Sequence, residues 1–400
     1  MPKEALEAVV AATEPTVGAI SRSRSRLLLN TLCLLCYLST THAAILPEDR
    51  ADVMYHGYDG GGLSVQGPSV LVRKAHKDKV SVWGNYYVDM ISSASIDVVT
   101  TASEYSEERT EMSVGVDYLH GKTFMGLSYT NSEEDDYSAN SMRFGISQDF
   151  FGDLTTLGIS YARGWDEVQR NGDENFAEQI DRQTYRADLS QIITRSLIVA
   201  LNYEAVTDEG FLNNPYRQVR YLDPTASLGY SYEPEVYPRT KTSNATAIRG
   251  MYYLPYRASL KAEYRYYTDT WGVSAWNAEV GYVHPLPEGM TLDLKYRFYD
   301  QSAADFYSDL FAYQSAQNFL ARDKELASYT THTLGAGISY QFQTGWLPLF
   351  ERGEASLFVD WIRFDYDDFR DVRVTELAPG EEPLYGFDSY VIRAFVSFWY

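Results

Sequence analysis

Cysteine is almost absent from this 400-residue sequence, which contains only Cys33 and Cys36. Both lie in an apolar stretch near the N-terminus, ahead of the part that we expect to fold. A mature chain without cysteine excludes disulfide bonds, thiolate metal sites and cysteine nucleophiles. Long apolar runs are absent as well. No stretch of about 18 consecutive apolar residues occurs, so the chain is not a helical membrane protein.

Positive charge is also scarce. The chain has 34 Lys and Arg residues against 55 Asp and Glu, a formal net charge of -21. A protein that binds nucleic acid needs a basic footprint for the phosphates, so nucleic acid is excluded as a partner. Tyrosine, by contrast, is abundant, with 34 residues. Because its side chain has an apolar ring and a polar tip, tyrosine suits a membrane–water interface.

The first 44 residues have the pattern of an N-terminal extension followed by a secretory signal peptide. A basic region with arginines at 22, 24 and 26 precedes an apolar region, residues 27–38, and a small-residue exit that ends at Ala44. We expect cleavage near Ala44 and export from the cytoplasm. The predicted parts are the extension and signal peptide, 1–44, an N-terminal periplasmic or lumenal segment, 45–78, and a transmembrane barrel, 79–400.

Beyond residue 75 the sequence repeatedly alternates between apolar and polar residues. In 290–299 the even positions are apolar or aromatic and most odd positions are charged or polar, which is the period of a strand with two different faces. Several strands carry an aromatic residue near one end of the apolar face, as in the girdles of membrane barrels. These girdle residues are Tyr118, Tyr129, Tyr161, Tyr203 and Tyr282.

The alternation predicts an all-β fold, a transmembrane antiparallel barrel of about 14 strands. Short turns and long loops alternate, as in outer-membrane barrels, whose short turns face the periplasm and whose long loops are extracellular. Residues 63–74 also alternate but would make an odd fifteenth strand. A barrel of 16 strands is the alternative if loop 207–242 hides another. The fourteen predicted strands are 79–91, 109–119, 122–131, 138–150, 154–165, 181–193, 195–206, 243–254, 256–267, 273–283, 290–300, 329–342, 353–365 and 388–400.

The last predicted strand alternates most clearly, and its apolar face ends on an aromatic residue. This pattern resembles the terminal signal that the barrel-assembly machinery recognises, which would make that machinery a partner during biogenesis. The residues of this assembly signal are Ile392, Ala394, Val396, Phe398 and Tyr400.

Three stretches resemble one Gram-negative family, the domain of unknown function 3570. They are MYHGYDGGGLSVQGPSVLVRK at 54–74, NYYVDMISSASIDVVTT at 85–101 and NPYRQVRYLDPTASLGYSYEPEVYPRTKTS at 214–243. The resemblance extends from about residue 50 to the C-terminus. It implies an outer-membrane barrel and supplies no catalytic residues.

We expect no enzyme, no metal site and no cofactor. Five histidines follow the signal peptide, and no two have the spacing of metal ligands. His332, the one well inside a strand, is expected on the lipid-facing side near the outer rim. The acidic runs 133–136 and 365–371 lack the spacing of a calcium loop, so we expect solvated external loops there.

The polar faces of the strands predict which charged residues line the lumen. Eight acids and eight bases are assigned to it, so net charge gives no strong selectivity, but rows of opposite charge would set up a field across a water-filled pore. The alternative is that these side chains pair across the interior and fill it. The predicted lumen residues are Glu111, Asp117, Asp188, Glu204, Glu263, Glu279, Asp293 and Asp360 with Arg143, Arg186, Arg249, Lys261, Arg265, Lys295, Arg297 and Arg393.

Loop 207–242 is the longest predicted connection, and its five tyrosines disfavour disorder. We expect it to fold inward as a constriction loop whose bases meet lumen acids such as Glu204, Glu263 and Glu279; outward folding is the alternative. The constriction-loop candidates are Tyr216, Arg217, Arg220, Tyr221, Tyr237, Arg239 and Lys241.

These patterns predict a protein of the Gram-negative outer membrane, in contact with lipid and lipopolysaccharide. We expect a porin-like channel or transporter for small polar or amphipathic solutes, with a charge-balanced lumen. The alternative is a structural barrel that docks a partner in the envelope without conducting. The identity of the solute stays open.

Overall fold

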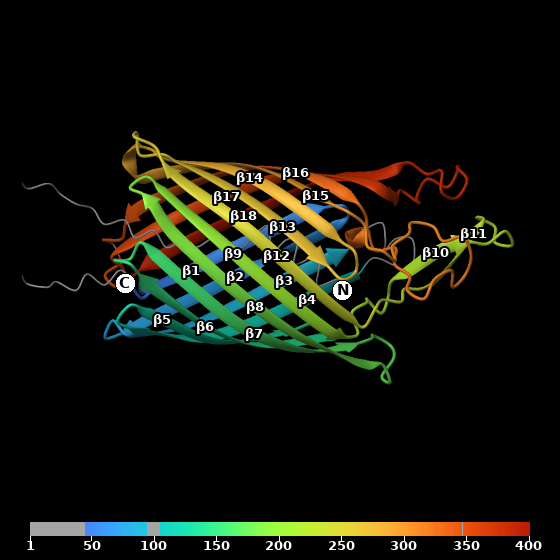
Figure 1. Ribbon diagram of the computed structural model, residues 1–400, viewed down its shortest axis with the longest axis horizontal. Helices are drawn as coiled ribbons and strands as arrows, with labels where there is room; N and C mark the ends of the chain where they lie inside the picture. Colours follow the sequence, from blue (N-terminus) through green and yellow to red (C-terminus); the bar gives the residue numbers. More distant parts are fainter. Residues whose placement is uncertain (1–44, 94–104, 346) are drawn as a thin grey trace, which may run out of the picture.

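Sixteen antiparallel strands form one closed barrel (Figure 1). The computed structural model describes residues 45–93, 105–345 and 347–400; the predicted signal peptide lies outside them. An all-β barrel is therefore confirmed, although the preferred count of 14 strands is wrong and the alternative of 16 is right. The barrel strands are β1 Arg50–Gly60, β2 Leu63–His76, β3 Val80–Ser93, β4 Tyr105–His120, β5 Thr123–Glu133, β6 Tyr137–Phe150, β7 Thr155–Gln169, β8 Ala177–Thr194, β9 Leu197–Gly210, β12 Thr240–Tyr253, β13 Ser259–Asp269, β14 Ser274–Pro285, β15 Met290–Gln301, β16 Tyr329–Gln343, β17 Arg352–Arg370 and β18 Leu384–Trp399.

The two strands missing from the sequence prediction are β1 and β2, so the interpretation of residues 45–78 as a segment apart from the barrel wall is wrong. β1 pairs with β18 and β2 with β3, which closes the ring. The alternation in β1 is weak because aromatic residues lie on both faces: Tyr55 is exposed outside, whereas His56 and Tyr58 are buried inside. Gly61 and Gly62, with φ of 59° and 79°, form the two-residue turn between the strands.

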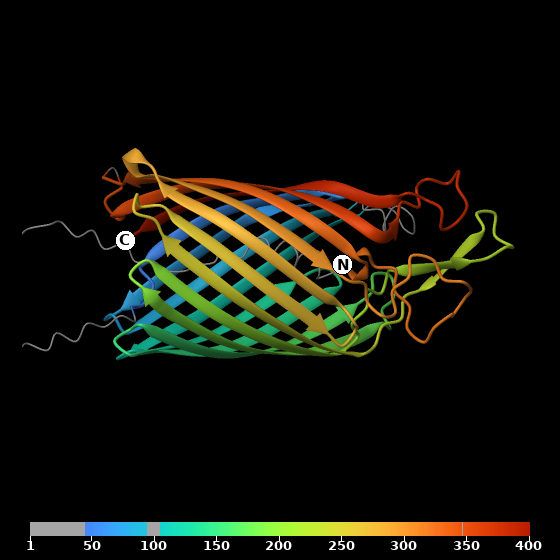
Figure 2. The ribbon, with the colours of Figure 1, turned by 45° about the horizontal axis from the view of Figure 1, so that its top comes forward.

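Loop 207–242 does not supply a barrel strand. Its two short strands, β10 (Gln218–Leu222) and β11 (Tyr230–Pro234), form a separate hairpin that projects beyond one end of the barrel (Figures 1 and 2). The fourteen other strands are all present, and several extend further toward that end than the alternation indicated. β7 and β17, for example, continue to Gln169 and Arg370. In these extensions the apolar residues, such as Val168 and Phe369, are buried instead of facing outward, so the apolar period of the wall is lost.

The two ends of the barrel differ in their connections, because the longest loops lie at one end, which also has short turns such as Gly61–Gly62. Arg50 pairs with Trp399, so the described chain enters and leaves at one end, and the connections at this end are short turns, the longest of them 344–351. The opposite end carries the long loops (Figure 2). We call it the loop end. Its longest loops are 211–239, 302–328 and 371–383.

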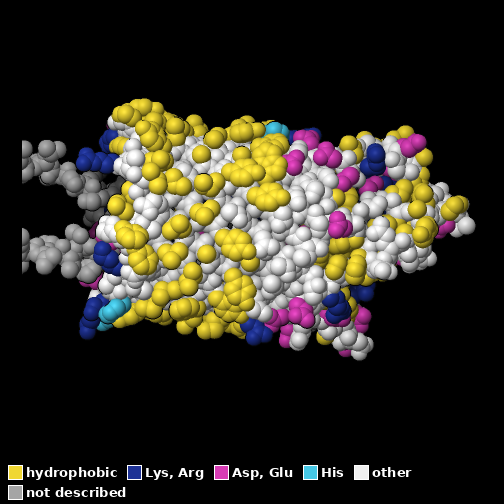
Figure 3. Space-filling model, in the orientation of Figure 1, with side chains coloured by type: hydrophobic (Ala, Val, Ile, Leu, Met, Phe, Trp, Pro, Cys, Tyr) yellow, Lys and Arg dark blue, Asp and Glu magenta, His cyan; other side chains and the backbone are white. Residues whose placement is uncertain are grey.

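The outer surface matches a bilayer. Apolar side chains cover the barrel wall seen in Figure 3, and acidic side chains gather toward the loop end. Tyrosine hydroxyls on this surface donate to outward-facing amides, which marks the level where the wall turns from apolar to polar. The donors and acceptors are Tyr55 to Gln66, Tyr129 to Asn140 and Tyr203 to Asn244, at 2.6–2.7 Å.

Aromatic residues also ring the wall at the end with the short turns, where Phe151 and Tyr256 are 79% and 57% exposed. Of the predicted girdle tyrosines, Tyr118 and Tyr282 lie near these turns, and the others lie farther toward the loop end. Within the described residues, no helix is long and apolar enough to span a membrane; both helices, η1 (Pro287–Gly289) and η2 (Lys324–Leu326), have three residues.

The lumen is filled by side chains on one side. Near β1, β2, β3, β17 and β18 it contains an apolar cluster. On this side, bulky rings lie over glycines of the adjacent strands. A Cβ at Gly115 would lie 2.3 Å from the Trp83 ring, and one at Gly337 would lie 2.2 Å from the Phe358 ring. Glycine at these positions allows large rings into the barrel without widening it. The remaining cross-section, mainly on the side of β8 to β16, stays open.

From its unequal ends we predict the orientation of the barrel: the loop end faces the outside of the cell and the short turns face the periplasm. Leu228 in the β10–β11 hairpin is 51% exposed and Leu349 in a short turn is 72% exposed. In a chain that has no other cysteine, a membrane-impermeant maleimide added to intact cells should label Leu228→Cys and spare Leu349→Cys until the outer membrane is permeabilised. Labelling of Leu349→Cys alone would invert the orientation.

Candidate functional site in the barrel lumen

A cavity of about 900 Å³ occupies the open side of the lumen. Its wall is rich in charged side chains contributed by β8 to β18 and, at its outer mouth, by the loops. Acids and bases are equal in number, nine of each, so the wall as a whole is neutral when all are ionised. They are Asp136, Asp188, Glu204, Asp208, Glu263, Glu279, Asp293, Asp323 and Asp360 with Arg182, Arg186, Lys241, Arg249, Lys261, Arg265, Lys295, Arg297 and Arg393.

The structure places all sixteen predicted lumen residues inside the barrel. Thirteen line the large cavity. Glu111 and Arg143 line a second cavity of about 270 Å³ between β4 and β8. Asp117 is buried and forms an ion pair with Arg73 of β2. The alternating parity of the strands thus carries each of these side chains to the inner face.

The ion pairs of the lumen run along the wall instead of across it. Arg186 pairs with Glu204 on the adjacent strand. Lys295 of β15 reaches Asp360 of β17 at 3.1 Å, over Gly335 of β16. A Cβ at Gly335 would lie 2.2 Å from Asp360 Oδ1, so glycine is needed for this pair to form. Because the pairs join neighbouring or next-neighbouring strands, they leave the cavity between them unfilled.

The expected inward position of loop 211–239 is wrong for most of the loop. Its base contributes to the cavity mouth through residues 211–215 and Tyr237, but β10 and β11 pack against loop 302–328 outside the barrel. Tyr221 bridges to Phe311 and Val236 to Leu320. Of the loop's three arginines, Arg217 and Arg220 pair with acids of the other long loops. Arg239 pairs with Glu178 near the end of β8, so none of the three reaches the acids deeper in the lumen.

Arg220 forms the centre of this outer assembly, which we call the cap: loops 211–239, 302–328 and 371–383. Its side chain is fully buried. The guanidinium donates to Glu382 and to Asp309, both at 2.5 Å, and Arg322 also pairs with Asp309 at 2.9 Å. Burial opposes ionisation of Glu382, but the hydrogen bonds and charge of Arg220 outweigh it, and the pKa of this carboxyl is lowered below 4.5. One buried cation therefore ties three loops together.

The other constriction-loop candidates lie around the mouth. Lys241 belongs to β12, lines the cavity and pairs with Asp269 at 3.5 Å. Tyr237 packs against Trp271 and Phe306. Arg217 pairs with Asp323, and Arg239 forms an exposed pair with Glu178 at the rim. These contacts narrow the mouth at its edge and place none of the loop's arginines against Glu204, Glu263 or Glu279.

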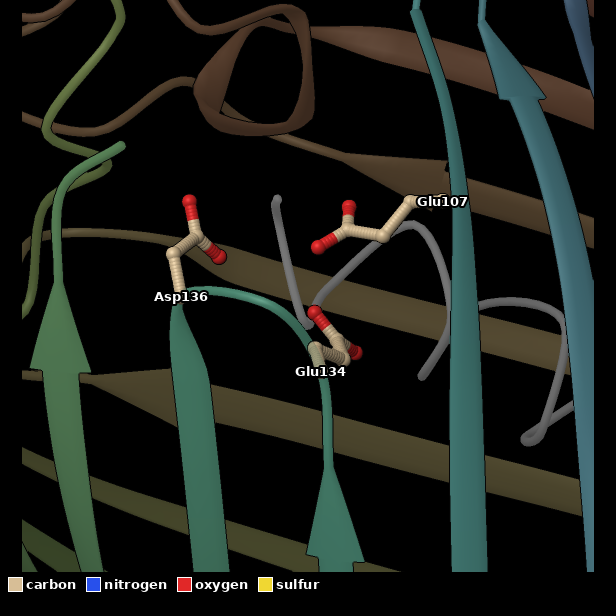
Figure 4. A group of neighbouring side chains, drawn as sticks. All are labelled: Glu107, Glu134 and Asp136. Carbon is tan, nitrogen blue, oxygen red and sulfur yellow. The ribbon is translucent and has the colours of Figure 1, made fainter. Parts of the chain in front are cut away.

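Three carboxylates converge at the outer rim (Figure 4). Glu107 of β4, Glu134 and Asp136 have carboxylate oxygens within 4.8 Å of one another. Asp136 is buried, which differs from the solvated loop expected for residues 133–136. It accepts a hydrogen bond from Tyr216, and burial together with this bond raises the pKa of Tyr216 to about 12. Calcium takes about six to eight oxygen ligands, so three carboxylates supply only part of such a shell.

A buried polar cluster in the wall formed by β1, β3 and β4 was not predicted from the sequence. The His56 ring stacks on Tyr87 at 4.6 Å, and its Nε2 lies 2.6 Å from Asp89 Oδ1. Asp89, fully buried, also pairs with Arg109 at 2.9 Å. The alternation of residues 63–74 was the sequence signal for this cluster. A barrel strand there requires a second strand beside it, and pairing of the two strands turns His56 inward. His332, by contrast, lies on the outer face as expected, beside Tyr296.

Comparison with known families identifies the chain. A family described as "Protein of unknown function (DUF3570)" matches residues 100–348. The chain belongs to this family. The matched region begins later and ends earlier than the sequence resemblance noted above, which ran from about residue 50 to the C-terminus. Among curated proteins, the search found no match to the chain.

The barrel of this DUF3570 protein is similar to solved outer-membrane barrels. A "Bacterial polysaccharide outer membrane secretin" shares 9% identity at a TM-score of 0.50, covering 88% of this chain and 99% of that one. A FadL homologue from Pseudomonas aeruginosa shares 10% at a TM-score of 0.40, covering 87% and 89%. OccK2 from the same organism, in complex with glucuronate, shares 10% at 0.41, covering 89% and 99%. The likeness to the first concerns the fold alone: that of an outer-membrane barrel.

The cap yields a prediction. Arg220→Ala removes one partner of a buried charge network and leaves Asp309 and Glu382 without it, a loss of about 3–5 kcal/mol. Protease added to the purified barrel should then cut within 302–328, while the barrel keeps its heat-modifiable migration on gels. Arg239→Ala, which removes an exposed pair with Glu178, should change nothing measurable. Equal resistance of both variants would contradict the role of Arg220.

Proposed function

We propose that this protein is an outer-membrane channel for small polar solutes. The observation that carries the proposal is the charged cavity of about 900 Å³ within the barrel. Side chains in it are accessible despite their ion pairs: Arg249 and Lys261 are 45% and 42% exposed. Charged groups on both sides of a water-filled path favour polar solutes over apolar ones.

The balance of nine acids and nine bases determines the expected selectivity. A pore wall of zero net charge does not exclude either sign of ion, so conduction should discriminate weakly between cations and anions. Selectivity among solutes would then come from local groups and from the width of the mouth, which Tyr237 and residues 211–215 help to form. The cap lies beyond this mouth and would restrict the size of entering solutes.

Ion conduction through the purified barrel in planar bilayers tests the proposal. Single channels should appear, with a potassium-to-chloride permeability ratio within about threefold of one. Arg249 faces the cavity, and Arg249→Glu leaves Glu263 without its partner. The wall then gains negative charge, so the reversal potential should shift toward that of potassium. Arg163→Glu is the matched control. Arg163 pairs with Asp181 and is 58% exposed, and it does not line either cavity.

Folded, heat-modifiable barrel that never conducts would overturn the channel proposal. The second candidate function, docking of an envelope partner, would then be preferred. A specific observation favours it: the cap exposes several large apolar side chains, which is typical of an interaction surface. They are Leu222, Leu228, Tyr313 and Phe319, at 41–61% exposure.

A further inference from the structure

Seven of the nine bases that line the large cavity have an acidic partner. In each pair the nitrogen and oxygen lie within 4 Å of each other, and six acids serve as the partners of the seven bases. The pairs are Arg182–Asp208, Arg186–Glu204, Lys241–Asp269, Arg249–Glu263, Lys261–Asp293, Lys295–Asp360 and Arg393–Asp360.

Arg265 and Arg297 are the two exceptions among the described residues. Neither forms an ion pair there, and Arg297 Nε is buried without a hydrogen-bond partner. Arg265 lies over the Tyr267 ring at 5.9 Å, a contact that supplies no carboxylate to the guanidinium. Because arginine stays protonated at all physiological pH values, both positions are permanently charged.

The two arginines face the same part of the cavity. Arg265 lies on β13 and Arg297 on β15, on either side of β14, and they are offset by two residues along the strands, so their backbones are about 12 Å apart. Asn277 of β14 pairs in register with Arg265. It is 2% exposed, and its Oδ1 has no hydrogen-bond partner among the described residues. Two long side chains can converge from these positions on a group that lies over β14.

We infer that Arg265 and Arg297 form a binding subsite for an oxyanion, a carboxylate or phosphate group of the solute that crosses the lumen. The inference rests on the proposed channel function and names the class of solute. Guanidinium groups bind such oxyanions through two parallel N–H donors. In the rest of the cavity, protein carboxylates occupy the equivalent positions beside each base. At Arg265 and Arg297 the solute supplies the missing partner.

Glu279 sets the strength of this subsite. It lies opposite Arg297 in the register of β14 and β15 but forms no ion pair with it. Its negative charge acts on Arg297 and weakens binding of a second anion there. The subsite therefore holds an oxyanion loosely, as a conducting channel requires, since a solute that binds too tightly does not leave.

Block of single-channel current by succinate and by inorganic phosphate tests the subsite. Each probe should interrupt the current of the unmodified barrel in a concentration-dependent manner, and the two probes separate carboxylate from phosphate ligands. Arg265→Gln/Arg297→Gln should raise the half-blocking concentration at least about tenfold. Arg186→Gln/Lys261→Gln removes the same number of charges from paired positions and should raise it much less. Glu279→Gln should lower it.

The outcomes separate this inference from the channel proposal. Conduction without block by either probe, or equal loss of block in the two double variants, overturns the subsite and leaves the channel intact. If the barrel does not conduct, calorimetric titration of the detergent-solubilised protein with succinate and phosphate decides the subsite by itself. Heat that is abolished in Arg265→Gln/Arg297→Gln and retained in Arg186→Gln/Lys261→Gln supports it, and any other pattern overturns it.

Discussion

In the hydrocarbon core of a membrane no water is available to pair with backbone N–H and C=O groups, so every strand there must be paired along both edges. The pairing of β1 with β18, from Arg50 with Trp399 to Gly60 with Ser389, meets this requirement for the ring as a whole. Closure at this seam fixes the strand number at sixteen. It thereby fixes the width of the lumen and which residues face it.

The lumen that results is filled by side chains on one side and contains a cavity lined by charged groups on the other. Large rings occupy the side of β1 to β3 and β16 to β18, where inward glycines such as Gly115 and Gly337 make room for them. On the other side, ion pairs lie flat along the wall. Pairing lowers the cost of holding many charges in a confined space, and its direction along the wall preserves the cavity.

Which residues of each strand face the lumen could be predicted from the sequence, because a lipid-facing apolar face and a polar face alternate with period two. For this reason the inward position of residues such as Glu263 and Asp360 followed from the sequence. β1 could not be found in the same way, since His56 and Tyr58 place aromatic rings on its inner face. The position of Arg220 depends on Asp309 and Glu382, which are 89 and 162 residues away. Contacts of such sequence separation leave no local pattern.

The unpaired state of Arg265 and Arg297 was equally hidden, because the sequence shows which residues face the lumen but not which of them meet. Lys295, for instance, bypasses its immediate neighbours to reach Asp360 across Gly335. Balance of charge over the whole wall therefore coexists with local imbalance. In the proposed channel, the total charge of the wall would admit ions of both signs, and the few groups that the pairing leaves over would distinguish solutes.

Modification of a single cysteine on the cavity wall tests most directly whether solutes pass through this lumen. Gly281 lines the cavity, and a Cβ there would meet only ordinary contacts at 3.5 Å or more; Val280, next to it, is 57% exposed on the outer face. A bulky, charged thiol reagent added during a bilayer recording should lower the current of Gly281→Cys in an irreversible step and leave Val280→Cys unchanged. A current that is insensitive to modification at Gly281, in protein shown to have reacted, would contradict conduction through the cavity.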